Sequence, residues 1–138
     1  MKAPVAALFV CAAFLSATSS AQSAPEPTEA QIDAAFKKAD PDGNGTLSWA
    51  EARRFGITRA AFEKANPDKD GSLDKKEFLA AVKIRFEQAN PDNDGTLDRK
   101  EAARAGIKSR KVFEAANPDN DGTLDLAEYL DALTLQAK

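Results

Sequence analysis

The chain has 138 residues, enough for one small domain, and its 22 acidic residues slightly outnumber its 19 basic residues. It contains no histidine, and its one methionine and one cysteine, Met1 and Cys11, both lie near the N-terminus. Beyond Cys11 the chain offers no thiolate, imidazole or thioether ligand, and no disulfide can form within it. These absences exclude most zinc and copper sites and leave hard cations bound by oxygen.

The first 21 residues have the layout of a secretory signal peptide. Lys2 precedes an apolar run over residues 4–15, which is too short to cross a bilayer, and small residues follow it. We therefore expect cleavage after Ala21, a periplasmic or secreted protein, and no membrane insertion of the mature chain. A buried N-terminal helix is the alternative. Residues 22–28 are predicted to form a flexible leader, followed by a single domain over residues 29–138.

A helix is predicted to open this domain. Thr28 and Gln31 have the spacing of a capping box, and the helical pattern ends near Ala39. From this helix onward one pattern occurs four times: a Phe, four residues later an Asp or Asn, and then a Gly-containing stretch that ends in Glu. The stretches that begin with the Asp or Asn span residues 40–51, 66–77, 90–101 and 117–128. Such repetition predicts four related structural units.

The segments between these four windows alternate in type. Gly56 follows the first window and Gly106 follows the third, and glycine there is typical of a helix end. Between the second and third windows there is neither Gly nor Pro, and Phe78, Val82 and Phe86 recur every four residues. This spacing predicts one continuous amphipathic helix that joins two related halves of the chain.

Each window resembles the EF-hand calcium loop, D-x-[DN]-x-[DN]-G-x5-E. Asn, Asp and Gly also favour plain turns, but all four windows share Gly at position 6, Leu at position 8 and Glu at position 12. The resemblance implies oxygen ligands at positions 1, 3, 5, 7, 9 and 12, with position 7 using its backbone carbonyl and position 12 both carboxylate oxygens. The implied ligands are Asp40, Asp42, Asn44, Thr46, Ser48, Glu51, Asn66, Asp68, Asp70, Ser72, Asp74, Glu77, Asn90, Asp92, Asp94, Thr96, Asp98, Glu101, Asn117, Asp119, Asp121, Thr123, Asp125 and Glu128.

The last three windows open with Asn-Pro, whereas the first opens with Asp-Pro. Proline pushes the residue before it out of the helical region. Asn66, Asn90 and Asn117 are therefore expected to end the incoming helix in an extended conformation. The amide keeps an oxygen ligand but loses a charge, and an Asp at position 9 restores that charge. Each of these loops thus carries four carboxylates, and the first loop carries three.

Calcium, at up to four ions, is the cofactor that the EF-hand resemblance favours. Four carboxylates also suit a trivalent ion, because the bound loop is then nearer to neutral. Pro at position 2, Asp at position 9, the predicted export and linkers of 12 to 15 residues resemble lanmodulin, the bacterial lanthanide-binding EF-hand family. The resemblance implies selective binding of trivalent lanthanide ions as the alternative function.

The expected fold is all-α: four EF-hand loop–helix repeats in a compact helical bundle, with short β-bridges between paired loops. The helix ends at Gly56 and Gly106 favour pairing of the first loop with the second and of the third with the fourth. Pairing of the first with the fourth and the second with the third stays open. Phe36, Phe62, Phe86 and Phe113 are expected to share one core, with Trp49 half-buried beside it.

The expected function is a calcium buffer or a metal-responsive sensor. Outside the windows, basic residues outnumber the acids, so a metal-ordered interaction module for an unknown protein partner is a further alternative. Its docking surface would lie around Arg53, Arg54 and Arg59, or around Arg104, Lys108, Arg110 and Lys111. Every clustered carboxylate is better explained as an ion ligand, so an enzyme is not expected. Nucleic-acid binding is not expected either, because the basic residues lack interleaved aromatic residues.

Overall fold

The computed structural model describes residues 25–137. The predicted signal peptide lies outside the described residues, as do the first three residues of the leader. None of the described helices is both long and apolar enough to cross a bilayer. In chain order the elements are α1 (Glu29–Ala39), β1 (Leu47–Ser48), α2 (Trp49–Phe55), α3 (Arg59–Ala65), β2 (Ser72–Leu73), α4 (Lys75–Ala89), α5 (Arg99–Arg104), α6 (Arg110–Ala115) and α7 (Leu126–Gln136).

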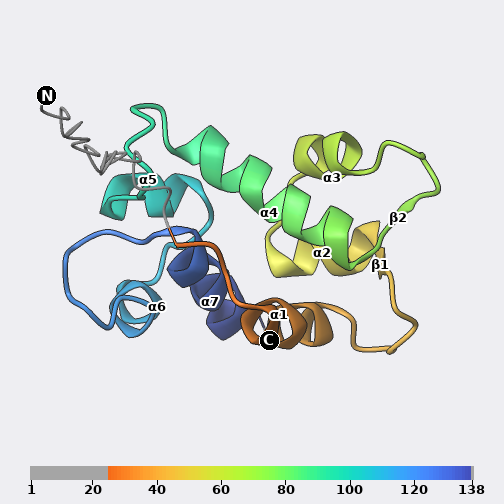
Figure 1. Cartoon of the computed structure of the whole chain (residues 1–138), viewed down its shortest axis with the longest axis horizontal. Helices are drawn as coiled ribbons and strands as arrows, with labels where there is room; N and C mark the ends of the chain where they lie inside the picture. The colour runs from red at the N-terminus through yellow and green to blue at the C-terminus, as the bar shows by residue number, and fades with distance from the viewer. Residues whose placement is uncertain (1–24, 138) are drawn as a thin grey trace, which may run out of the picture.

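The fold is all-α, as predicted, and its four loops are arranged as two pairs. Loops 1 to 4 are the four windows in chain order. The strands β1 and β2 pair antiparallel, with Leu47 opposite Leu73, and a single antiparallel bridge joins Leu97 to Leu124. Loop 1 therefore pairs with loop 2 and loop 3 with loop 4, which excludes the alternative pairing. Figure 1 shows the first half (loops 1 and 2) on the right and the second half (loops 3 and 4) on the left.

The long helix α4 joins the two halves and is the continuous helix that the sequence predicts. It runs from loop 2 into loop 3 without interruption (Figure 1). Phe78, Val82 and Phe86 lie on its buried side. The helix ends at Asn90, whose φ of −113° and ψ of 74° lie outside the helical region, as the following proline favours, but also outside the extended region that the sequence predicts.

Capping residues define where the helices begin and end. Thr28 and Gln31 form the predicted capping box at the start of α1. Thr58 and Ser109 cap α3 and α6, which lack such a box. Gly56 ends α2 with a φ of 106°, a left-handed conformation that glycine adopts without steric cost.

Aromatic side chains form the centre of the core. Phe78 of α4 packs edge-on against Phe36 of α1 and Phe55 of α2, with ring centroids 5.6 and 5.2 Å apart. In the second half Phe86 packs against Tyr129 at 5.8 Å. The Phe that precedes each loop belongs to this core in every unit, although Phe36 is only partly buried. Their predicted shared role is thus confirmed.

The described end of the leader lies against the domain. Glu26 forms an ion pair with Lys83 of α4 at 2.9 Å, and Pro27 is buried. The last leader residues therefore contact the helix that joins the two halves.

Candidate metal centre

The four loops share one pattern of internal hydrogen bonds. In each loop the backbone N–H at position 5 donates to the carboxylate at position 3, over 3.2 to 3.3 Å. The N–H at position 7 donates to the side-chain oxygen at position 5, over 2.8 to 2.9 Å. These are Asx turns, in which a short polar side chain holds the backbone two residues on. The ligand side chains predicted at positions 3 and 5 are thus fixed by the loop itself.

A capping box closes every loop at positions 9 and 12. The N–H at position 9 donates to Oε2 of the glutamate over 2.8 to 2.9 Å. The glutamate N–H donates back to the side chain at position 9. Oε1 of each glutamate makes no hydrogen bond within residues 25–137, so that oxygen is free to bind a cation. The box ties the exit helix, meaning the helix that leaves the loop, to the predicted metal site.

The aspartates at position 9 therefore have a second role. The sequence predicts Asp74, Asp98 and Asp125 as ligands that restore a lost charge. In the structure each of them is the N-cap of its exit helix and accepts a backbone hydrogen bond through Oδ1. Position 9 of an EF-hand loop often reaches its ion through a water molecule, so capping and indirect ligation are compatible. The carboxylate contributes charge near the site from this position.

The side chain at position 1 is buried in all four loops. Asp40 accepts from the N–H of Gly45 at 2.9 Å. Asn66 can make the equivalent bond from Gly71 at 3.2 Å with its amide turned to suit. In loops 3 and 4, Oδ1 of Asn90 and Oδ1 of Asn117 are buried without any hydrogen-bond partner.

An unpaired buried acceptor costs about 1–3 kcal/mol, and a bound cation at position 1 would satisfy it. The burial of the two amide oxygens is therefore an observation that fits a metal ion to loops 3 and 4. The sequence predicts an amide oxygen at this position, whereas its burial depends on the tertiary packing.

Loop 1 brings its acids closest together. Ligand atoms of Asp40, Asp42 and Glu51 lie within 4.8 Å of one another, the one group of three such side chains in the described part of the chain. Burial acts to raise the pKa of Asp40, but hydrogen bonds from the backbone of Gly45, with the side chain of Asp42 and from the backbone of Asn44 together lower that pKa. The neighbouring Asp40 carboxyl raises the pKa of Asp42. Loops 2 to 4 lack this close group because position 1 is an amide and the acid at position 9 caps a helix.

Position 4 of every loop has a left-handed backbone, a feature that is not among the sequence predictions. The φ values are 66° at Gly43, 56° at Lys69, 55° at Asn93 and 57° at Asn120. Gly and Asn adopt this region readily, whereas a lysine there is strained. The Gly or Asn at position 4 of loops 1, 3 and 4 is the sequence feature that indicates this backbone conformation. Lys69 is the exception among the four.

Replacing Lys69 with the asparagine that loops 3 and 4 use is expected to stabilise the protein by about 1 kcal/mol, because it relieves left-handed strain. Urea unfolding at saturating metal would measure the change. Lys108→Asn is the control, since Lys108 is also exposed and its φ is not positive; its effect should stay within about 0.5 kcal/mol. Equal changes in both variants would contradict the strain argument.

The side chain at position 10 of each loop reaches the incoming helix of the paired loop. Trp49 from loop 1 packs on Phe62 of α3 at 5.4 Å. Lys75 from loop 2 bonds to Asp33 of α1 at 2.6 Å. Across the second half, Arg99 lies over the ring of Phe113 and Leu126 lines a hollow together with Phe86. Each pair of loops is thus held by two reciprocal side chains in addition to its β-bridge.

Trp49 also lines a hollow of about 480 Å³ beside loop 2, together with Arg59, Asn66, Lys69 and Gly71. Its predicted half-buried state is confirmed. Because it lies next to positions 1, 4 and 6 of the partner loop, its fluorescence should respond to loop 2 as well as to its own loop.

Comparison with known proteins agrees with this geometry. A family model described as an EF-hand domain pair matches residues 12–54, a range that begins before the described residues and takes in α1, loop 1 and most of α2. This part of the chain matches the EF-hand family, and loops 2 to 4 repeat the motif of the matched loop 1. EF-hand loops of this type indicate binding of calcium-type metal ions.

No curated protein matches the chain. Among the solved structures that match is a homolog of programmed cell death 6 protein from Leishmania major Friedlin. It is 17% identical, the match covers 72% of this chain and 71% of that one, and the TM-score is 0.34.

Proposed function

We propose that all four loops of this EF-hand protein bind calcium, and that the protein is exported and acts as a calcium buffer or a metal-responsive sensor. The observation that carries the four-site proposal is the hydrogen-bond pattern common to every loop. Positions 3, 5 and 12 are held by the same backbone donors in each. Loops that share this internal hydrogen-bond pattern and carry oxygen ligands at the same positions should each hold an ion.

The roles of the proposed ligands follow from their contacts. The side chains at positions 1, 3 and 5 supply oxygen from the incoming side of the loop, and position 7 supplies its carbonyl. The glutamate at position 12 adds carboxylate oxygens and is bound to the first turn of the exit helix. The ion supplies positive charge and coordination only. We therefore propose a binding protein with no catalytic role.

Selective lanthanide binding is the second candidate, and the charge of loops 2 to 4 favours it. Each of these loops brings four carboxylates to a trivalent ion and leaves a net charge of about −1, whereas calcium leaves about −2. The amide at position 1 retains the ligand oxygen. Loop 1, with three carboxylates, is the loop that best suits calcium.

Ion count is the decisive experiment for the four-site proposal. Native mass spectrometry and calorimetry of the chain from Gln22 onward should show four Ca²⁺ ions, and each of Glu51→Gln, Glu77→Gln, Glu101→Gln and Glu128→Gln should remove or weaken one. We expect a loss of at least about tenfold in affinity at the altered loop, since even groups that only orient a ligand contribute 10- to 100-fold.

Glu87→Gln is the matched control, because Glu87 is an exposed glutamate of α4 outside the loops. It should leave the ion count and the affinity unchanged. Fewer than four ions at saturation, or an ion count indifferent to the four loop variants, would overturn the four-site proposal. La³⁺ in place of Ca²⁺ decides between the two candidates. Retention of La³⁺ in millimolar Ca²⁺ supports lanthanide selectivity, and displacement supports calcium.

Export has its own test. Expression of the whole chain in a Gram-negative host, followed by fractionation and N-terminal sequencing, should place the protein outside the cytoplasm with Gln22 as its first residue. An uncleaved cytoplasmic protein would contradict the proposed signal peptide without affecting the metal sites.

A further inference from the structure

The exit helices of loops 1 and 3 each end in a Gly-Ile turn, at residues 56–57 and 106–107, and these two turns are called the corners. After α2, Gly56 has a φ of 106°, and after α5, Gly106 has a φ of 101°. The next residue in each case, Ile57 or Ile107, donates back to a carbonyl of the helix at 2.9 or 2.8 Å. These two corners therefore report the positions of the exit helices of loop 1 and loop 3.

The exit helices of the even-numbered loops contact both corners. From α4, Nε of Arg85 donates to the carbonyl of Gly56 at 3.2 Å. Nη2 of the same side chain lies 3.3 Å from where a Cβ on Gly106 would be. All four exit helices thus meet at one place, the exit-helix junction, which also includes three residues of α7: Tyr129, Leu133 and Gln136.

The α7 residues join the same two corners. Tyr129 donates its hydroxyl hydrogen to the carbonyl of Ala105 at 3.0 Å, and Gln136 donates to the carbonyl of Gly106 at 3.0 Å. Leu133 comes within 3.1 Å of the Cβ position of Gly56. A side chain at Gly56 would therefore also press on Leu133, in addition to being strained by the backbone angle.

Arg85 is the charged side chain that joins the two corners of this junction. It is half-buried, and within residues 25–137 no carboxylate oxygen lies within 4.0 Å of its guanidinium nitrogens. Its polar contacts are instead the carbonyl of Gly56 at the end of α2 and the hydroxyl of Tyr129, and it lies against Gly106 at the end of α5. The planar guanidinium has donors in several directions, so one side chain can contact both corners.

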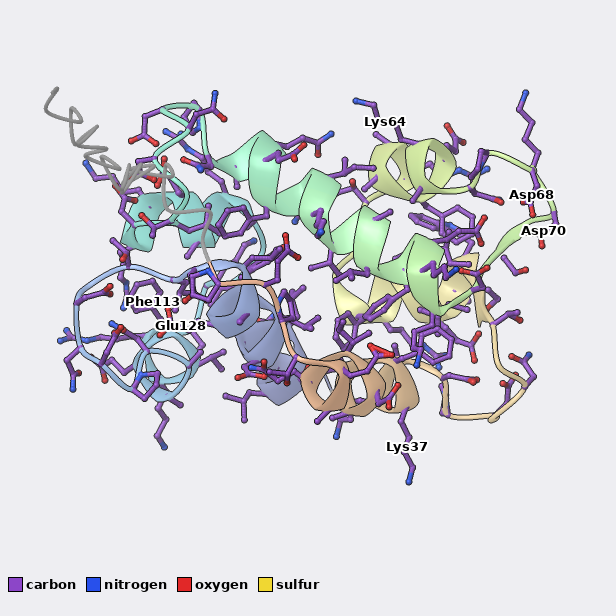
Figure 2. The ribbon with its side chains drawn as sticks, in the orientation of Figure 1. Lys37, Lys64, Asp68, Asp70, Phe113 and Glu128 are labelled. Atoms are coloured by element: carbon purple, nitrogen blue, oxygen red, sulfur yellow. The ribbon has the colours of Figure 1, made fainter. Side chains whose placement is uncertain are left out.

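We propose that Arg85 is a positioning residue that couples metal binding in the first half to metal binding in the second half. An ion held by the glutamate at position 12 fixes the start of an exit helix, and all four exit helices meet around Arg85. Figure 2 places Asp68 and Asp70 of loop 2 at the right-hand end of the molecule and Glu128 of loop 4 in the opposite half. Communication between these loops must pass through elements that both halves share, and the exit-helix junction is such an element.

This inference rests on the proposed metal binding, and one labelling scheme tests both. The chain has seven glycines, so selective ¹⁵N-glycine labelling gives at most one backbone amide signal from each. Four of these glycines occupy position 6 of the loops and report filling of each loop separately. The signals of Gly56 and Gly106 report the two corners.

The coupling is measured by disabling one half. Glu51→Gln and Glu77→Gln together disable loops 1 and 2, and the Ca²⁺ midpoints are then read at Gly95 and Gly122. With Arg85 present we expect those midpoints to rise at least about fivefold when the first half is disabled, within the usual range of coupling between sites. The coupling ratio is the midpoint with the first half disabled divided by the midpoint with it intact. In Arg85→Met this ratio should be near one.

Lys83→Met is the matched control. It removes a cation from the same helix, but Lys83 pairs with Glu26 and does not reach the junction, so the ratio should stay as in the parent. Arg85→Lys keeps the charge without the planar fork and should lower the ratio; it also serves if Arg85→Met does not fold at saturating metal. A merely structural role for Arg85 would weaken all loops alike and leave the ratio unchanged.

The outcomes separate the two proposals. If none of the four position-6 signals responds to Ca²⁺ or La³⁺, the proposed function fails. If these signals respond but the ratio survives in Arg85→Met or Arg85→Lys, or is already one in the parent chain, the role of Arg85 is overturned and the proposed function stands. The coupling is supported if the ratio falls only in the Arg85 variants. In these variants the amide signal of Gly106 should also no longer shift when loops 1 and 2 fill.

Discussion

Removal of bound ions by a chelator is expected to lower both the helical content and the melting temperature of the protein. Without a cation, acids crowd each loop. In loop 4, burial raises the pKa of Glu128, and the charges of Asp125, Asp119 and Asp121 raise it further. Two carboxylates about 4 Å apart repel by roughly 4 kcal/mol at an effective dielectric of about 20. Folding and binding should therefore be coupled.

The size of the effect follows from linkage. An ion present at about 100 times its dissociation constant stabilises the folded state by roughly 2.7 kcal/mol per site. In a domain of this size, each kcal/mol shifts the melting temperature by about 4–8 °C. Far-ultraviolet circular dichroism during heating, with and without excess chelator, measures both changes. Two sites together then contribute roughly 5.4 kcal/mol, so the expected result is a fall of at least about 20 °C for each pair of loops emptied.

A variant with all four position-12 glutamates changed to glutamine is the control for chelation. Since this variant cannot hold ions well, chelator should leave its spectrum and melting temperature unchanged. An unchanged spectrum for the parent chain on chelation would mean that the loops keep their structure without ions, and the coupling of folding to binding would be wrong.

The parts of the fold that the sequence predicts correctly depend on local patterns. The capping box at Thr28 lies within four residues, and the four-residue spacing of Phe78, Val82 and Phe86 defines α4 by itself. The loop pairing was inferred from two glycines because a left-handed helix end lets consecutive helices fold back. These signals involve neighbours in the sequence, so no knowledge of the tertiary packing was needed.

Other features depend on packing between distant residues, and the sequence could not show them. The contact of Arg85 with Gly56 spans 29 positions, and that of Gln136 with Gly106 spans 30. No local pattern marks either contact. The contact of Trp49 with Phe62 likewise depends on how the two loops pair. Asp74 illustrates a different limit: one carboxylate can be both an N-cap and a metal ligand, and the loop pattern in the sequence predicts only the second role.

Phe78→Ala is expected to destabilise the metal-loaded protein by about 3–5 kcal/mol, the usual range for removing a buried Phe. Phe78 is fully buried, and its ring contacts Phe36 and Phe55, which belong to the helices that enter and leave loop 1. The substitution leaves a cavity where α1, α2 and α4 meet. Small domains are stable by only about 5–15 kcal/mol, so a large fraction of the stability would be lost. Urea unfolding at saturating Ca²⁺ measures the change.

Leu135→Ala is the matched control, because Leu135 is the one large hydrophobic side chain that is exposed, at 57%, within the described residues. It should change stability by no more than about 0.5 kcal/mol. Phe78→Ala should also weaken Ca²⁺ binding by loops 1 and 2, since binding must then order a less stable core, while direct contacts in the loops are unchanged. A loss of stability below about 1 kcal/mol, or unfolding without any change in Ca²⁺ affinity, would show that this aromatic cluster does not support the loops.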